Sequence, residues 1–143
     1  MGDKAISLLH IEDDNVDKMV VERVLKKLNL VSNLYHAPNG EEALFLLRGT
    51  EGRSRPDPFP QIILLDINMP RMNGIEFLRE LRQDDTLKHL SVYMVTTSND
   101  EADVKGAHEL NVAGYILKPV DIQQFENTFR ILGSYWQICE FPA

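Results

Sequence analysis

Acidic side chains follow two strongly apolar segments of this sequence. Glu12 and Asp13 come directly after the segment 6–11, and Asp66 comes directly after the segment 61–65. Short apolar runs of this kind are typical of strands buried on both faces of a parallel sheet. An ionisable group at the end of such a strand is poorly explained by solubility, so these carboxylates are candidates for chemistry. The alternative is an ordinary cap or helix start, where acidic residues are also favoured.

If the two strands are neighbours in the sheet, three carboxylates meet in one small space. Their mutual repulsion disfavours a state in which all are ionised and unpaired, and a bound cation relieves it. Oxygen ligands describe a Mg²⁺ site better than a zinc or iron site, because no cysteine or histidine is suitably placed. Beside such a metal, Asp66 could attack a phosphorus centre and form an acyl phosphate. Thr96 and Lys118, at the ends of two further apolar segments, would then hold the transferred oxygens.

Five strands are expected to position these residues, at 6–11, 34–37, 61–65, 91–96 and 114–117. Between and after them, apolar residues recur one helical turn apart, which predicts five helices. The first such stripe is Val16, Val20, Val24 and Leu28, and the last is Ile122, Phe125, Phe129, Leu132 and Trp136. This alternation implies right-handed crossovers and a doubly wound α/β fold with a parallel sheet. Ligands bind beyond the carboxyl ends of the strands in such folds, where the candidate residues lie.

Length and composition favour one soluble domain. The chain has 143 residues, and we expect a single domain over 1–143, with its core at about 6–132 and a tail at 133–143. The net charge of −7 opposes binding to nucleic acid or to a membrane surface. No apolar stretch approaches the roughly 20 residues that span a bilayer, and the lone Cys139 cannot form an internal disulfide. These features predict a cytoplasmic protein.

Other classes of protein account for part of this pattern. A flavodoxin needs a Gly-rich phosphate loop after the first strand, where Glu12, Asp13 and Asp14 would repel the phosphate. A P-loop nucleotidase needs a Gly-rich loop ending in Lys and Ser/Thr, which this sequence lacks. A phosphohydrolase with an aspartate nucleophile also uses Mg²⁺, but its nucleophile typically follows the first strand, whereas Asp66 follows the third. Multiple turnover on small phosphoesters would favour that class.

Short motifs stand at the predicted strand ends. They are Ile11-Glu12-Asp13-Asp14, Leu65-Asp66-Ile67-Asn68-Met69-Pro70, Met72-Asn73-Gly74, Val95-Thr96-Thr97-Ser98, and Tyr115 with Lys118-Pro119. In this order they resemble the receiver domain of two-component response regulators, over about residues 6–130. The resemblance implies a flavodoxin-like fold, with a five-stranded parallel sheet in the order 2-1-3-4-5 and five helices. A receiver that no longer takes phosphate is the remaining competitor, and the complete residue set argues against it.

The resemblance implies a phosphoacceptor signalling protein rather than an enzyme in the usual sense. Asp66 would accept a phosphoryl group from a sensor histidine kinase in a Mg²⁺-dependent reaction, and the chain would assist its own phosphorylation and dephosphorylation. The implied metal ligands are Glu12, Asp13, Asp66 and the backbone carbonyl of Asn68.

The resemblance also implies a switch. Thr96 and Lys118 would contact the phosphoryl group, and Thr96 would couple it to the aromatic residue Tyr115. The Lys118–Pro119 peptide bond is expected to be cis, which is uncommon even before proline. Glutamate in place of aspartate at position 12 departs from the commonest family pattern, and we expect this change to be harmless.

A narrower likeness concerns the partners. The Pro-bearing segment 49–60 and the ending 135–142 are similar to those of small response regulators that serve phytochrome-type histidine kinases. The signal would then pass to an unknown downstream protein, by contact or by phosphate relay. Four apolar residues fall largely off the last helical stripe: Ile131, Tyr135, Ile138 and Phe141. They predict an exposed patch and a homodimer through the C-terminal helix and tail.

Overall fold

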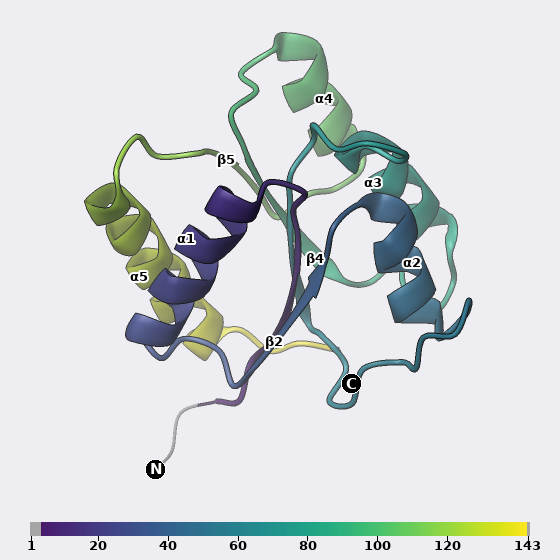
Figure 1. Ribbon diagram of the computed structural model, residues 1–143, viewed down its shortest axis with the longest axis horizontal. Coiled ribbons are helices and arrows are strands. Elements are labelled where there is room, and N and C mark those ends of the chain that lie inside the picture. Colours follow the sequence, from purple (N-terminus) through teal and green to yellow (C-terminus); the bar gives the residue numbers. More distant parts are fainter. Residues whose placement is uncertain (1–3, 143) are drawn as a thin grey trace.

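A parallel sheet forms the centre of the molecule, with helices on both sides (Figure 1). The computed structural model describes residues 4–142, with five strands in the order β2-β1-β3-β4-β5 and five helices. The strands are β1 (Ser7–Ile11), β2 (Asn33–Ala37), β3 (Ile62–Leu65), β4 (Ser91–Thr96) and β5 (Gly114–Leu117). The helices are α1 (Asn15–Lys27), α2 (Gly40–Arg48), α3 (Gly74–Gln83), α4 (Glu101–Glu109) and α5 (Ile122–Ile138). The predicted fold and strand order are therefore confirmed.

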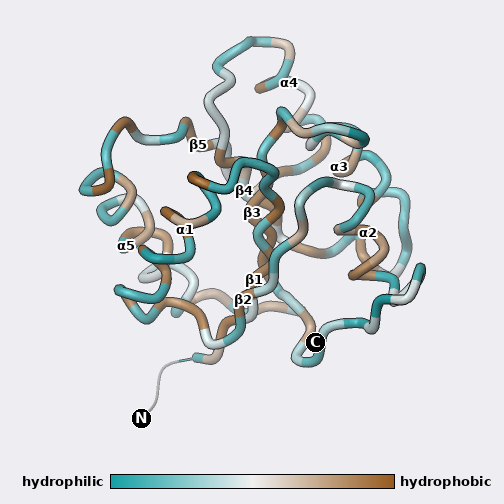
Figure 2. The backbone as a smooth tube through the Cα atoms, in the orientation of Figure 1, coloured by the Kyte–Doolittle hydropathy of each residue, from teal (hydrophilic) through white to brown (hydrophobic). Residues whose placement is uncertain are grey.

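The sheet separates two hydrophobic cores, because successive residues of a strand face opposite sides. In β1, Leu9 and Ile11 belong to the core shared with α2 and α3, whereas Leu8 belongs to the core shared with α1 and α5. Figure 1 shows α1 and α5 on one side of the sheet and α2 and α3 on the other. In Figure 2 apolar residues concentrate along the central strands. Burial on both faces explains why β1 and β3 are continuous apolar runs.

Each helix begins at a side chain that caps its first turn. These side chains accept hydrogen bonds from backbone N–H groups two or three residues later. The five capping residues are Asp14, Asn39, Asn73, Asp100 and Asp121. Because the caps follow closely on the strand ends, they fix where the chain turns back over the sheet.

Two residues of the predicted helical stripes are exposed instead of buried. Val16 is 68% exposed and Ile122 is 46% exposed, whereas Phe129 and Trp136 lie in the core. Val16 and Ile122 both stand in the first turn of a helix. Periodicity predicts the face of a helix but not where its contact with the sheet begins.

The C-terminal segment folds back onto the domain. After α5, Phe141 packs against the core that contains Trp136, so its predicted place in an exposed patch was wrong. Lys4 holds this segment, because its backbone N–H donates to the Gln137 side chain and its ammonium donates to the Cys139 carbonyl. Within residues 4–142, no helix combines the length and apolar character needed to cross a membrane.

The predicted cis bond at Lys118–Pro119 was wrong. In the part of the chain that the structure describes, the cis peptide bond is Asp57–Pro58, in the loop before β3, and Lys118–Pro119 is trans. An X–Pro bond prefers trans by only about 0.5–1 kcal/mol, so the sequence alone does not decide the isomer.

Candidate functional site

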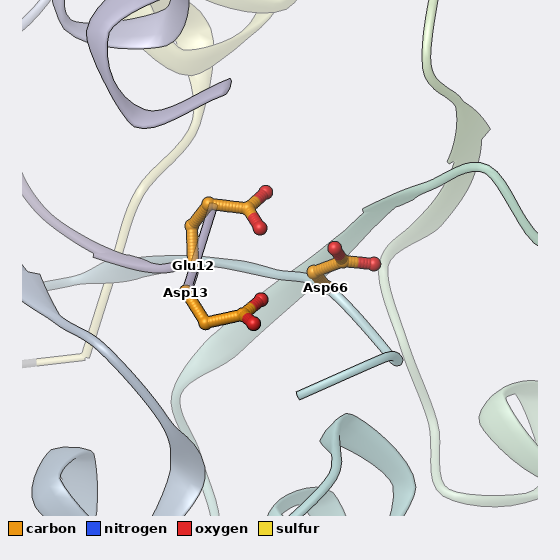
Figure 3. Close-up of side chains that lie close together, drawn as sticks. All are labelled: Glu12, Asp13 and Asp66. Atoms are coloured by element: carbon orange, nitrogen blue, oxygen red, sulfur yellow. The ribbon is translucent and has the colours of Figure 1, made fainter. Parts of the chain in front are cut away.

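The carboxyl ends of β1 and β3 bring three carboxylates together. The strands pair with Ile11 opposite Leu65, so the residues that follow lie side by side. One carboxylate oxygen each from Glu12, Asp13 and Asp66 lies within 4.8 Å of the others, and Figure 3 shows the three side chains at this edge. Glu12 is 2% exposed and Asp66 is 7% exposed, whereas Asp13 is open to solvent. The predicted convergence of acidic side chains is confirmed.

Lys118 reaches this acid cluster from the end of β5. Its ammonium group donates to Glu12 at 2.9 Å, to Asp66 at 3.0 Å and to Asp17 of α1 at 2.6 Å. Its backbone N–H donates to the Thr96 carbonyl at 2.8 Å, which keeps the chain beside β4 as it leaves the sheet. An ammonium group has three donors, so every donor of Lys118 is used.

Burial and crowded charge change the acid–base behaviour of the site. Burial raises the pKa of Glu12 to about 7, the charge of Asp66 adds to this rise, and the hydrogen bond from Lys118 opposes it. Burial also disfavours a charged Lys118, but hydrogen bonds to the three carboxylates outweigh it and hold the Lys118 pKa above its ordinary value. Lys118 is therefore charged at neutral pH. An excess of carboxylate oxygens over cationic groups is a donor set that suits a hard divalent cation.

The start of α3 fixes the backbone around Asp66. Asp66 Oδ1 accepts a hydrogen bond from the N–H of Ile67 at 2.7 Å, and the N–H of Gly74 donates to the Ile67 carbonyl at 2.9 Å. Only glycine fits at position 74, because a Cβ atom there would lie 2.2 Å from the Asp66 carbonyl oxygen. Asn68 is exposed in the loop between β3 and α3, and its carbonyl stays a predicted metal ligand.

Thr96 and Tyr115 are linked through the loop after β4. Thr96 is fully buried, and its hydroxyl oxygen accepts a hydrogen bond from the N–H of Ser98 at 3.3 Å. The Ser98 carbonyl accepts a hydrogen bond from the Tyr115 hydroxyl at 2.8 Å. Tyr115 also stacks on His108 of α4, with 6.4 Å between the ring centroids. A movement of the Thr96 hydroxyl could therefore reach α4 through Ser98, Tyr115 and His108.

Two residues beside the site had no role in the sequence-based prediction. Asp17 lies in the first turn of α1, only four residues after Asp13, and this closeness in sequence could have placed it at the same edge. His10 is buried in β1, its Nδ1 atom has no hydrogen-bond partner among residues 4–142, and burial lowers its pKa to about 3. It faces His36 of β2, with 6.1 Å between the ring centroids. His10 is therefore a neutral core residue.

A cavity of about 440 Å³ lies away from these residues. Its lining includes Phe59 and Gln61 before β3, Leu90 before β4, and Phe141 of the C-terminal segment. Residues that precede parallel strands lie at the edge opposite to the acid cluster. The cavity therefore takes no part in this site.

The fold and the site together define a receiver domain. Residues 8–130 match the response regulator receiver domain model, and the chain belongs to this family. Phosphorylation on an aspartate is typical of the family. Receiver domains bind a divalent metal ion, and the acid cluster supplies oxygen donors for one.

Known relatives have the same fold over nearly their whole length. Response regulator Rcp1 of Synechocystis sp. is 33% identical over 129 residues, which cover 90% of this chain and 87% of Rcp1. The crystal structure of the Mn²⁺-bound form of Rcp1 has a TM-score of 0.83 at 31% identity, with coverage of 96% of this chain and 99% of that chain. The phosphorylated cyanobacterial phytochrome response regulator RcpA has a TM-score of 0.84 at 26% identity, with coverage of 98% and 100%.

Proposed function

We propose that this protein is a phosphoacceptor of a two-component system, in which Asp66 receives a phosphoryl group from a histidine kinase. The observation that carries the proposal is the position of Asp66, between two further carboxylates and the Lys118 ammonium. A carboxylate oxygen of Asp66 attacks phosphorus, and an O–P bond forms as the P–N bond to the donor histidine breaks. The electron pair of that bond leaves with the imidazole.

Charge neutralisation is the main task of the other residues. Transfer brings an anionic phosphoryl group to a site that already holds Glu12 and Asp13. Lys118 donates one N–H to Asp66, and this donor passes to a phosphoryl oxygen once Asp66 carries the acyl phosphate. The Thr96 hydroxyl, at the end of the neighbouring strand, donates to another phosphoryl oxygen.

Glu12, Asp13, Asp66 and the Asn68 carbonyl would hold Mg²⁺. When bound, the ion compensates the negative charge of the acid cluster and of the phosphoryl oxygens. An all-oxygen donor set with an open, exposed side at Asp13 suits an ion that keeps several water ligands. The Rcp1 structure with Mn²⁺ supports a divalent ion of this class.

Labelling with acetyl phosphate tests the assignment, with intact-mass measurement as the readout. Wild type should gain one phosphoryl group only when Mg²⁺ is present, and Asp66→Asn should gain none. Asp85→Asn is the matched control, because Asp85 is an exposed aspartate whose side chain contacts Lys88 at the surface. Equal labelling of wild type and Asp66→Asn would overturn the assignment. Multiple turnover on small phosphoesters would instead favour a phosphohydrolase.

Exposed apolar side chains beside the site fit a protein as the phosphodonor. Val16 and Met19 of α1 are exposed next to Asp17, and Val120 is exposed two residues after Lys118. Exposed apolar side chains close in sequence to the residues of a charged site are typical of a protein docking surface. Similarity to Rcp1 and to the phytochrome response regulator RcpA supports a phytochrome-type histidine kinase as that partner.

The outer face of α5 supports a homodimer. Ile131, Tyr135 and Ile138 are 72%, 52% and 78% exposed, and their spacing places them on one stripe of the helix. An apolar stripe on one helix suits a two-fold contact, because the same stripe on a second copy is complementary to it. We therefore assign the dimer contact to this stripe, without Phe141.

Sedimentation velocity tests the dimer. The double variant Ile131→Gln/Ile138→Gln should be monomeric at concentrations where wild type is dimeric. A truncation after Gly133 is a poorer test, because it removes Trp136, which is 1% exposed and part of the core. A monomeric wild type at micromolar concentration, with and without phosphate on Asp66, would refute this assembly.

A further inference from the structure

The Lys118 ammonium has one partner outside the acid cluster. Glu12 and Asp66 belong to the cluster, whereas Asp17 lies in the first turn of α1. The Asp17 contact has the shortest N–O distance, 2.6 Å, against 2.9 Å for Glu12 and 3.0 Å for Asp66. Because an ammonium group has three donors, Asp17 takes one that would otherwise point toward the cluster.

The position of Asp17 is set by the helix that carries it. Asp14 caps α1 and accepts hydrogen bonds from the backbone N–H groups of Val16 and Asp17. The helix packs against α5, so the Asp17 carboxylate approaches Lys118 from a supported element. An acidic residue in a first turn is also favoured by the helix dipole, and that ordinary role would affect stability alone.

We propose that Asp17 is a positioning residue that draws Lys118 toward α1 and thereby frees Glu12 and Asp66 to bind a divalent cation. The inference rests on the proposed function, because it requires that the acid cluster binds metal. A cation that enters the cluster must displace an ammonium already paired with Glu12 and Asp66. Asp17 gives that ammonium a carboxylate outside the cluster, so Lys118 is not left buried without a partner.

Loss of the Asp17 carboxylate weakens metal binding in two ways. In Asp17→Asn the charged partners left to Lys118 are both cluster residues, so the ammonium competes more strongly with the metal for them. One negative charge near the metal is also lost. Both effects have the same sign, and their sum is expected to be about tenfold in affinity, as for other residues that support metal ligands.

Metal affinity can be measured directly, with Mn²⁺ alone followed by EPR and Mg²⁺ added as a competitor. Asp17→Asn should weaken the binding of both ions about tenfold, and Asp17→Glu, which keeps the carboxylate, should recover most of the loss. Glu22→Gln is the matched control, because it removes the same charge from the same helix at a position where Glu22 contacts Lys18. This control should stay within about twofold of wild type, because Glu22 is partly exposed and already paired with Lys18, so its charge is screened.

A double-mutant cycle separates positioning from plain charge. In a Lys118→Met background, Asp17→Asn should weaken Mn²⁺ binding clearly less than it does in wild type, because only the loss of charge remains. Equal affinity of wild type and Asp17→Asn, with both shown to be folded by urea unfolding, would overturn the inference. The same loss with and without Lys118 would also overturn it. A wild type that binds no Mn²⁺ would instead overturn the proposed function.

Discussion

Gly74 tests whether the backbone beside Asp66 must be held as closely as the structure shows. A Cβ atom at this position would lie 2.2 Å from the Asp66 carbonyl oxygen and 2.9 Å from the Ile67 Cα atom. Both are backbone atoms, so no side-chain rotation can relieve the contact. Gly74→Ala must therefore move α3, the end of β3, or both by about 1 Å to restore ordinary packing distances.

The expected cost follows from that movement. Extra atoms in a well-packed region typically cost about 1–3 kcal/mol, and a backbone clash belongs at the upper end of this range. A loss of about 3 kcal/mol corresponds to about 10 °C in Tm for a chain of this size. Misplacement of a reacting group by about 1 Å can slow a reaction about 100-fold, so labelling of Asp66 by acetyl phosphate should slow by a similar factor.

Gly106→Ala is the matched control for this substitution. Gly106 lies within α4, and a Cβ atom there would meet nothing within 4 Å. Alanine is the better helix former, so the control should be more stable by about 0.5–1 kcal/mol and should label normally. Urea unfolding and the initial rate of labelling measure both quantities. A Gly74→Ala protein within about 0.5 kcal/mol of wild type, with an unchanged labelling rate, would refute the reasoning.

Three further outcomes are expected. Thr96→Ala should still accept phosphate. Phosphorylation should change amide exchange around Ser98, Tyr115 and α4 much less in this variant than in wild type. An equal change in both proteins would disprove the coupling. The Glu12 pKa of about 7 lies above its ordinary value of 4.5, so metal-free protein should lose stability as pH rises from about 4.5 to about 7. Mg²⁺ affinity should rise as pH approaches about 7, because the metal displaces a proton from Glu12. Glu12→Gln should flatten both profiles in unfolding and Mn²⁺ titrations, and unchanged slopes would contradict this assignment. Met19→Gln should slow transfer from a kinase while labelling by acetyl phosphate stays unchanged, and equal kinase rates would exclude Met19 from the docking surface.

The sheet and the acid cluster could be predicted from the sequence because both follow from the pattern of apolar residues along the chain. Continuous apolar runs predicted buried parallel strands, and the carboxyl ends of such strands meet at one edge. Glu12, Asp13 and Asp66 follow two neighbouring strands, so their convergence required only the strand order. Lys118 follows another strand of the same sheet and reaches them from there.

The remaining features depend on contacts between residues far apart in the sequence, and the pattern of apolar residues does not specify such contacts. The return of Phe141 to the core depends on hydrogen bonds between Lys4 and the end of α5, which join the two ends of the chain. Val16 and Ile122 are exposed because packing of their helices against the core begins after the first turn, and the spacing of apolar residues does not give that starting point. The contact between Asp17 and Lys118 depends on side-chain conformation across α1 and β5, which the spacing of acidic residues does not specify.

Two chains of contacts begin at the site, and they lead to different surfaces. Through Lys118 and Asp17 the site contacts α1, beside the exposed Val16 and Met19. A second chain of contacts begins at Thr96, at the end of the strand next to β3, and passes through Ser98 to Tyr115 and α4.

Under the proposed function, a phosphoryl group on Asp66 would offer new acceptors to Lys118 and to Thr96 at the same time. It can shift the protein between two packings only to the extent that it contacts one of them better. The α1 contact lies beside the expected kinase surface, whereas the Tyr115 contact reaches a different face. We therefore expect substitutions at Asp17 and Met19 to change the phosphorylation of Asp66, and substitution of Thr96 to change the response of α4 to it.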